Sequence, residues 1–86
     1  MEISKIQKWL FQYLKFQPKK DFDEKVETAV DSLNHLKRIQ GTNSVDERRQ
    51  EVEQILGDLL LKILEITNDL QCDMNTILKT HFKLGV

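Results

Sequence analysis

The sequence predicts a single all-α domain of four helices, a four-helix bundle-like protomer that associates through its long helices. Apolar residues recur at steps of three and four along most of the chain, which is the spacing of one helix face. Only three glycines and one proline interrupt the 86 residues. No stretch shows the alternation of apolar and polar residues that is typical of strands. A chain of this length forms one domain, covering residues 1–86.

The first predicted helix covers residues 3–16 and the second covers residues 20–39. Pro18 separates them, because the residue before a proline avoids the helical backbone conformation. In the second helix, aspartates fall in the first turn and basic residues in the last, which is the charge order that the helix dipole favours. Its predicted apolar seam consists of Phe22, Val26, Ala29, Leu33 and Leu36.

The third predicted helix starts at Ser44 and runs to Leu70. Ser44 and Glu47 have the spacing of a capping box, in which two side chains bond to free backbone N–H groups at a helix start. The predicted seam of this helix consists of Val45, Val52, Leu56, Leu59, Ile63, Ile66 and Leu70. Asp73 is the expected N-cap of a fourth helix, residues 74–82.

The third helix carries more apolar surface than three short companions from one chain can cover. Leu60, Leu61 and Leu64 add a second apolar face beside its seam. A helix that is apolar most of the way round needs neighbours on most sides, and a chain this short has only a marginal core of its own. We therefore expect a homodimer or a homotetramer with this helix at the centre.

The composition excludes several classes of protein. Thirteen basic and fourteen acidic residues nearly cancel, whereas a general nucleic-acid binder needs surplus positive charge. The apolar runs are too short to span a bilayer, and we expect no membrane partner. A lone cysteine, Cys72, and the absence of a signal-peptide core favour a cytoplasmic location.

Acidic residues gather on one side of the second predicted helix. At about 100° per residue, the side roughly opposite the apolar seam carries Glu24, Glu27, Thr28, Asp31 and His35. Carboxylates three or four residues apart on one helix, facing another such pair, are able to hold Mg²⁺, which prefers oxygen ligands. The alternative is that these acids are the solvated side of an amphipathic helix, with His35 paired to Asp31.

Asp58 stands in the most apolar stretch of the third predicted helix. A carboxylate among leucines and isoleucines must find a partner or lose its solvation at a cost. Lys62, four residues on, is one candidate partner through a helical ion pair. A metal ion or a cation from another subunit is the other.

The C-terminal half of the sequence resembles MazG-like proteins. Residues 57–61 read Gly-Asp-Leu-Leu-Leu, and residues 66–74 contain an asparagine before a short turn and an aspartate. In that family, a helix with an E-L-G-D-[VL]-L pattern continues into an asparagine-containing end, and an aspartate starts the next helix. The N-terminal half agrees more loosely, through residues 6–9 and 16–19 and the acidic helix. The resemblance rests mainly on residues 57–78.

This resemblance implies a nucleotide pyrophosphohydrolase that cleaves NTP to NMP and pyrophosphate with Mg²⁺, usually as a dimer or tetramer. The family holds the metal with an E-x-x-E pair on one helix and an E-x-x-D pair on the next. Asp58 matches the aspartate of the second pair. Ile55 stands where the glutamate is expected, and isoleucine ligates nothing.

The first pair has two possible registers. Anchoring on Pro18 places it at Thr28 and Asp31, whereas a shift of one helical turn places it at Glu24 and Glu27. The candidate metal ligands are therefore Asp58, Asp31, Glu27 and Glu24. Lys19 and Lys20 are candidate contacts for the phosphates of a nucleotide.

Two functions follow as hypotheses. The first is a MazG-like pyrophosphohydrolase of reduced or altered activity. The second is a catalytically inactive, oligomeric interaction or regulatory module with the same architecture, which retains the option of binding a nucleotide. A generic four-helix adaptor with an accidental resemblance is a third reading, since one fold hosts many functions.

Overall fold

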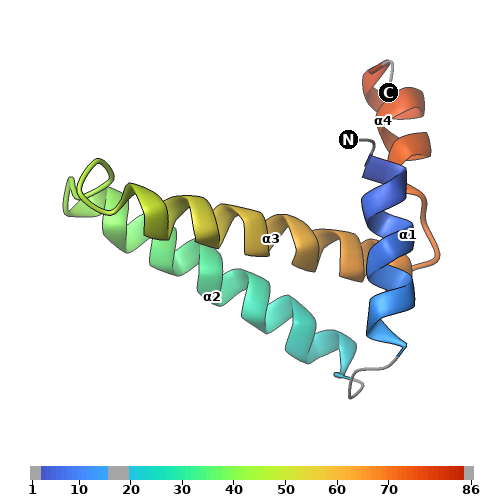
Figure 1. Ribbon diagram of the computed structural model, residues 1–86, viewed down its shortest axis with the longest axis horizontal. Helices are drawn as coiled ribbons and strands as arrows, with labels where there is room; N and C mark the ends of the chain where they lie inside the picture. Colours follow the sequence, from blue (N-terminus) through green and yellow to red (C-terminus); the bar gives the residue numbers. More distant parts are fainter. Residues whose placement is uncertain (1–2, 16–19, 85–86) are drawn as a thin grey trace.

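The computed structural model describes residues 3–15 and 20–84, and within them it holds four helices and no strand (Figure 1). The helices are α1 (Ile3–Leu14), α2 (Phe22–Gly41), α3 (Arg49–Asp69) and α4 (Met74–Phe82). The prediction of an all-α protein with four helices is confirmed. No helix in the described part of the chain is long and apolar enough to cross a membrane.

The helices form an open arrangement. α2 and α3 make an antiparallel hairpin, α1 crosses the C-terminal end of α3, and α4 lies beside α1 (Figure 1). The main packed pairs are α2 with α3, α1 with α3, and α1 with α4. Among the described residues, the hairpin is therefore covered by α1 at one end only, and most of its length has no other helix packed on it.

The start of α3 differs from the prediction. Ser44 does not cap this helix: its hydroxyl lies 2.9 Å from the hydroxyl of Thr42 and bonds the Thr42 carbonyl. Helix α3 begins five residues later, at Arg49, after an N-cap, Arg48, whose side chain makes no capping bond. The capping box was wrong because a neighbouring hydroxyl competes for the serine, and local side-chain bonds of this kind favour turns.

The other ends agree more closely with the prediction. Asp73 caps α4 as expected, since its carboxylate accepts bonds from the backbone N–H and the hydroxyl of Thr76. Helix α4 has the predicted bounds. Helix α2 continues two residues beyond its predicted end, to Gly41, and the left-handed Asn43 follows in the turn. Helix α1 ends at Leu14, and the rest of its predicted range lies partly outside the described residues.

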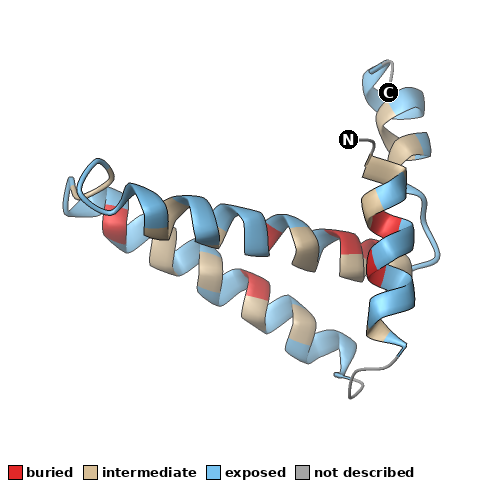
Figure 2. Ribbon diagram, viewed as in Figure 1, coloured by how far each residue is buried: buried red, intermediate tan, exposed pale blue. Residues whose placement is uncertain are grey.

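The core within the chain is small (Figure 2). The buried apolar side chains among the described residues are Leu10, Ala29, Ile39, Leu59 and Leu64. Leu59 is the one member of the predicted α3 seam among them, while Leu56 and Ile63 of that seam are 50% and 42% exposed. Helix α3 buries Leu64 completely, and α1 packs on the same C-terminal part of the helix.

Gln7 fastens α1 to the end of α3 and to the start of α4. This side chain is only 6% exposed. Its Nε2 donates to Oδ1 of Asn68 at 2.7 Å and to the carbonyl of Cys72 at 2.8 Å, and its Oε1 accepts from the backbone N–H of Met74 at 3.0 Å. Every buried side-chain polar atom in the described residues has a partner. The Gln7 side chain thus joins α1 to α3 and α4 at the point where the three helices meet.

The whole protomer is more extended than a compact chain of its size. Its radius of gyration is 14.6 Å, whereas about 12 Å is typical of 86 residues. Its accessible surface is 6848 Å², about 1,500 Å² more than the roughly 5,300 Å² expected of a compact monomer of this mass. The protomer therefore exposes surface that compact proteins of this size bury.

Candidate functional site

Polar contacts join α2 to α3 along one line. Nζ of Lys25 in α2 lies 2.6 Å from Oδ2 of Asp69 and 3.3 Å from Oε1 of Glu65, both in α3. In the middle of the hairpin, Nζ of Lys62 donates to the hydroxyl of Ser32 at 3.2 Å. Closer to the connecting turn, Nε2 of His35 lies 3.1 Å from Oε1 of Glu51. These contacts fix the register of the hairpin.

Lys25 is the most enclosed charge in this line, since 13% of its side chain is exposed. Burial by itself lowers the pKa of Lys25, but the hydrogen bonds and charges of Asp69 and Glu65 outweigh it and raise the pKa above the ordinary value. The ammonium group therefore stays charged and ties the N-terminal part of α2 to the C-terminal part of α3.

An unpartnered apolar surface lies on one face of the hairpin. On α2 and on α3 alike, exposed apolar residues follow one another at helical steps, roughly 120° round from the line of cross-helix contacts at about 100° per residue. On each helix, viewed from its own N-terminus, the apolar stripe is displaced from the contact line in the same direction of rotation. In an antiparallel pair, two such stripes come to the same face. We call this the apolar face, and its residues are Phe22, Val26, Val30, Leu33, Leu56, Leu60, Ile63 and Leu70.

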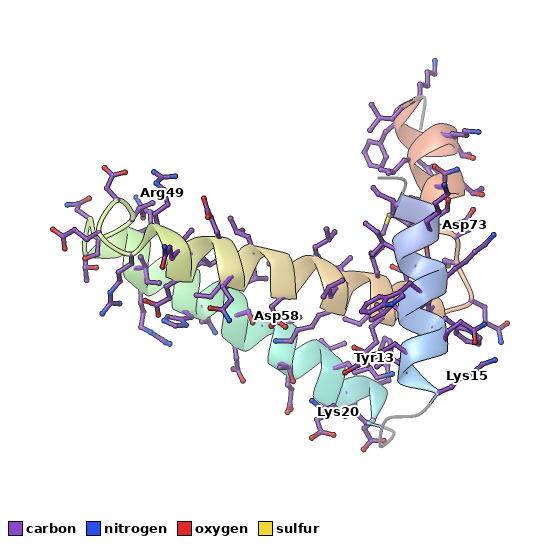
Figure 3. The ribbon with its side chains drawn as sticks, in the orientation of Figure 1. Tyr13, Lys15, Lys20, Arg49, Asp58 and Asp73 are labelled. Atoms are coloured by element: carbon purple, nitrogen blue, oxygen red, sulfur yellow. The ribbon has the colours of Figure 1, made fainter. Side chains whose placement is uncertain are left out.

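The candidate metal ligands lie on the opposite side. Glu24 and Asp31 stand roughly 100° from the contact line in the other sense, and Glu27 points farther round, away from α3. Asp58 lies on the same side of α3, and Figure 3 shows it at the front of the hairpin between the two helices. We call this the polar face, and its residues are Glu24, Glu27, Asp31, Glu51, Gln54 and Asp58.

Asp58 forms the helical ion pair that was one of its two predicted alternatives. Its Oδ2 lies 2.6 Å from Nζ of Lys62, and 55% of its side chain is exposed. The carboxylate is thus solvated in the protomer, because the leucines beside it in the sequence point to other sides of the helix. Lys62 also reaches Ser32 and so places a positive charge between α2 and α3 next to Asp58.

The polar face brings the predicted ligands to one side of the hairpin without gathering them. Within residues 3–15 and 20–84, no three side chains among His, Cys, Asp and Glu come close enough to hold a metal ion. A shallow, open depression runs along α3 and is lined by Glu51, Gln54, Ile55, Asp58 and Leu61. Ile55 lies in this depression at the position where the family resemblance expects a ligand. The donors in the described part of one chain therefore do not fit a multi-carboxylate Mg²⁺ site.

The predicted phosphate contacts have different outcomes. Lys19 lies outside the described residues. Lys20 is exposed and lines a cleft of about 420 Å³ between α1, α2 and α3, together with Lys15 and Lys25. Lys25 is already paired with two acids, and Lys15 lies over the ring of Phe11 at 5.0 Å. Acidic groups of α3 line the same cleft, which makes it mixed in charge.

The polar contacts between helices were not foreseen from the sequence. His35 pairs across the hairpin with Glu51, and not with Asp31 as expected. The bonds of Gln7 were also missed, although the 61-residue separation between Gln7 and Asn68 joins two stretches that carry the family resemblance. Helical periodicity identifies which residues share a face, but it gives no information about a partner on another helix.

The chain was compared with known proteins in three ways. A scan against models of protein families, a search of curated proteins and a search of solved structures each found no match. The interpretation of the site therefore rests on the residues themselves.

Proposed function

We propose that this chain is a non-catalytic helical interaction module of MazG-like architecture, and that its working form is an assembly of identical chains. The observation that carries the proposal is the open protomer, whose hairpin leaves an exposed apolar face that no other described helix covers. Monomeric soluble proteins seldom expose large contiguous apolar patches, and such patches commonly mark interaction sites.

The polar face supports the non-catalytic part of the proposal. Asp58 is neutralised by Lys62 at 2.6 Å, and Ile55 contributes no oxygen one turn before it. Hydrolysis at a phosphoryl centre with Mg²⁺ requires ligands that converge on the metal. The acids of α2 and Asp58 of α3 do not converge in the described residues of one chain, so we derive no hydrolytic step from them.

The second candidate function is a Mg²⁺-dependent nucleotide pyrophosphohydrolase of altered activity. One observation favours it: Asp58, Asp31, Glu24 and, less directly, Glu27 share the polar face, and Asp58 is accessible to solvent. In this reading, a rearrangement of the hairpin or a second chain would complete the ligand set.

An assay of pyrophosphate release separates the two functions. The full chain is incubated with a panel of nucleoside triphosphates and Mg²⁺ or Mn²⁺, beside Asp58→Ala and the matched control Glu53→Ala on the same helix. We expect no release above buffer for any of the three proteins. Release by the unaltered chain that is lost in Asp58→Ala and kept in Glu53→Ala would establish the enzyme. Calorimetry with the same nucleotides then distinguishes a silent binder from a scaffold.

A further inference from the structure

We infer that the apolar face is the docking surface for a second copy of this chain, so that two α2–α3 hairpins pack face to face about a two-fold axis as an intermolecular four-helix bundle. This inference rests on the proposed assembly and names the surface through which it occurs. A two-fold interface uses the same patch on both subunits, and the patch must therefore be complementary to itself.

The distribution of exposed apolar side chains identifies the face. Thirteen large apolar side chains are exposed in the described part of the chain, and eight of them belong to the apolar face. Their exposed fractions run from 37% for Val26 to 59% for Leu70. Single exposed apolar residues are ordinary, but eight in two adjoining stripes form a contiguous patch.

The dimensions of the two stripes suit a second copy. At 1.5 Å per residue, the stripe on α2 from Phe22 to Leu33 is about 17 Å long, and the stripe on α3 from Leu56 to Leu70 is about 21 Å long. Two stripes of similar length on antiparallel helices give a patch of the size that its own two-fold image can cover. When two hairpins pack in this way, the apolar-face residues of all four helices are buried.

The exposed area agrees with what a stable dimer needs. The protomer exposes about 1,500 Å² more than a compact monomer of its mass, and a standard protein interface buries about 800 Å² on each partner. A second copy on the apolar face accounts for a large part of this excess. The remaining exposed apolar side chains lie on α1 and near α4, outside this face.

Charge selects the apolar face over the polar face. The polar face carries five carboxylates, on Glu24, Glu27, Asp31, Glu51 and Asp58. Asp58 is paired with Lys62 and Glu51 lies beside His35, but the three acids of α2 form no ion pair with the described residues, and two copies docked through this face would bring their like charges together. Such juxtaposition disfavours association. The eight residues of the apolar face are uncharged, and the exposed Lys37 lies at its edge, one helical turn after Leu33, so the two-fold image meets the face itself without this penalty.

Sedimentation equilibrium of the full chain tests the inference. Leu33→Lys and Leu60→Lys each place a charge in the centre of the apolar face, and we expect each to raise the dimer dissociation constant at least tenfold. Leu84→Lys is the matched control, because Leu84 and Leu33 are both 52% exposed, and it should associate like the unaltered chain. Leu33→Ala and Leu60→Ala repeat the test with residues that favour helix, and a several-fold rise is expected.

Each other outcome overturns the inference in a different way. If the unaltered chain associates and the four face variants associate equally well, the apolar face is not the interface, although the assembly stands. If association survives in these variants and is lost in Trp9→Lys, the aromatic side chains of α1 form the contact instead. An unaltered chain that stays monomeric overturns both the face and the proposed assembly, whereas pyrophosphate release alone would overturn only the non-catalytic assignment.

Discussion

Gln7 shows at the scale of one residue how a polar side chain determines the arrangement of helices. Its amide is buried and bonds to α3, to the loop that follows and to the first residue of α4. A buried polar group is costly unless it is paired, and its partners become costly when it is removed. The sequence gives no sign of this role, since glutamine on a helix is usually a solvated residue.

Replacing Gln7 with alanine should destabilise the protein by about 2–3 kcal/mol, because it leaves the carbonyl of Cys72 and the backbone N–H of Met74 without their partner. Urea unfolding followed by circular dichroism measures the loss. Gln12→Ala on the exposed side of α1 is the control and should change stability by less than about 0.5 kcal/mol. Equal effects of the two substitutions would contradict the bonding described for Gln7.

Lys25 gives a prediction about pH. Asp69 and Glu65 raise the pKa of Lys25 in the folded protein against the opposing effect of burial. A raised folded pKa means that the stabilisation is fully present below the unfolded value of 10.5 and is lost as the pH rises through the folded value. The free energy of unfolding should therefore fall above about pH 10.5, and Lys25→Met should remove part of this alkaline fall. Urea titrations at pH 8 to 11.5 would refute the prediction if both proteins lost stability in parallel.

At the scale of the element, the helices could be predicted from the sequence and their ends only in part. Apolar periodicity identified all four, and Asp73 marked the start of α4, where its carboxylate accepts bonds from Thr76. Ser44 had the same kind of signal, but Thr42 lies two residues away and bonds it. The periodicity also could not tell that Leu64 is completely buried while Leu56 stays half exposed, since both lie on apolar sides of one helix.

Asp73, which caps α4, and Ser44, which caps no helix, should respond differently to replacement by alanine. Asp73→Ala should cost about 1 kcal/mol, as is usual for the loss of an N-cap, and should speed amide exchange in α4. Ser44→Ala should cost less than about 0.5 kcal/mol, because Ser44 makes no bond to the first turn of α3. Hydrogen exchange read helix by helix distinguishes the effects. Faster exchange at the start of α3 in Ser44→Ala would contradict this account and show that Ser44 caps α3.

At the scale of the whole molecule, the sequence predicted a surplus of apolar surface, and the protomer exposes such a surface on one face of its hairpin. The predicted ligands were harder to place. Glu24, Glu27, Asp31 and Asp58 do share a side, as helical spacing indicates, but spacing carries no information about whether carboxylates on two helices reach one point. Lys62 could be recognised from the sequence as a partner of Asp58, whereas its bond to Ser32 depends on the register of the hairpin.

The mass of the full chain in solution tests the central claim most directly, which is that the open hairpin is completed by another copy. Light scattering over a dilution series, with circular dichroism on the same samples, should give at least twice the protomer mass of 10.2 kDa while the protein is helical, and helicity should fall as the assembly dissociates. A particle of 10.2 kDa that keeps its full helicity across the series would contradict the claim.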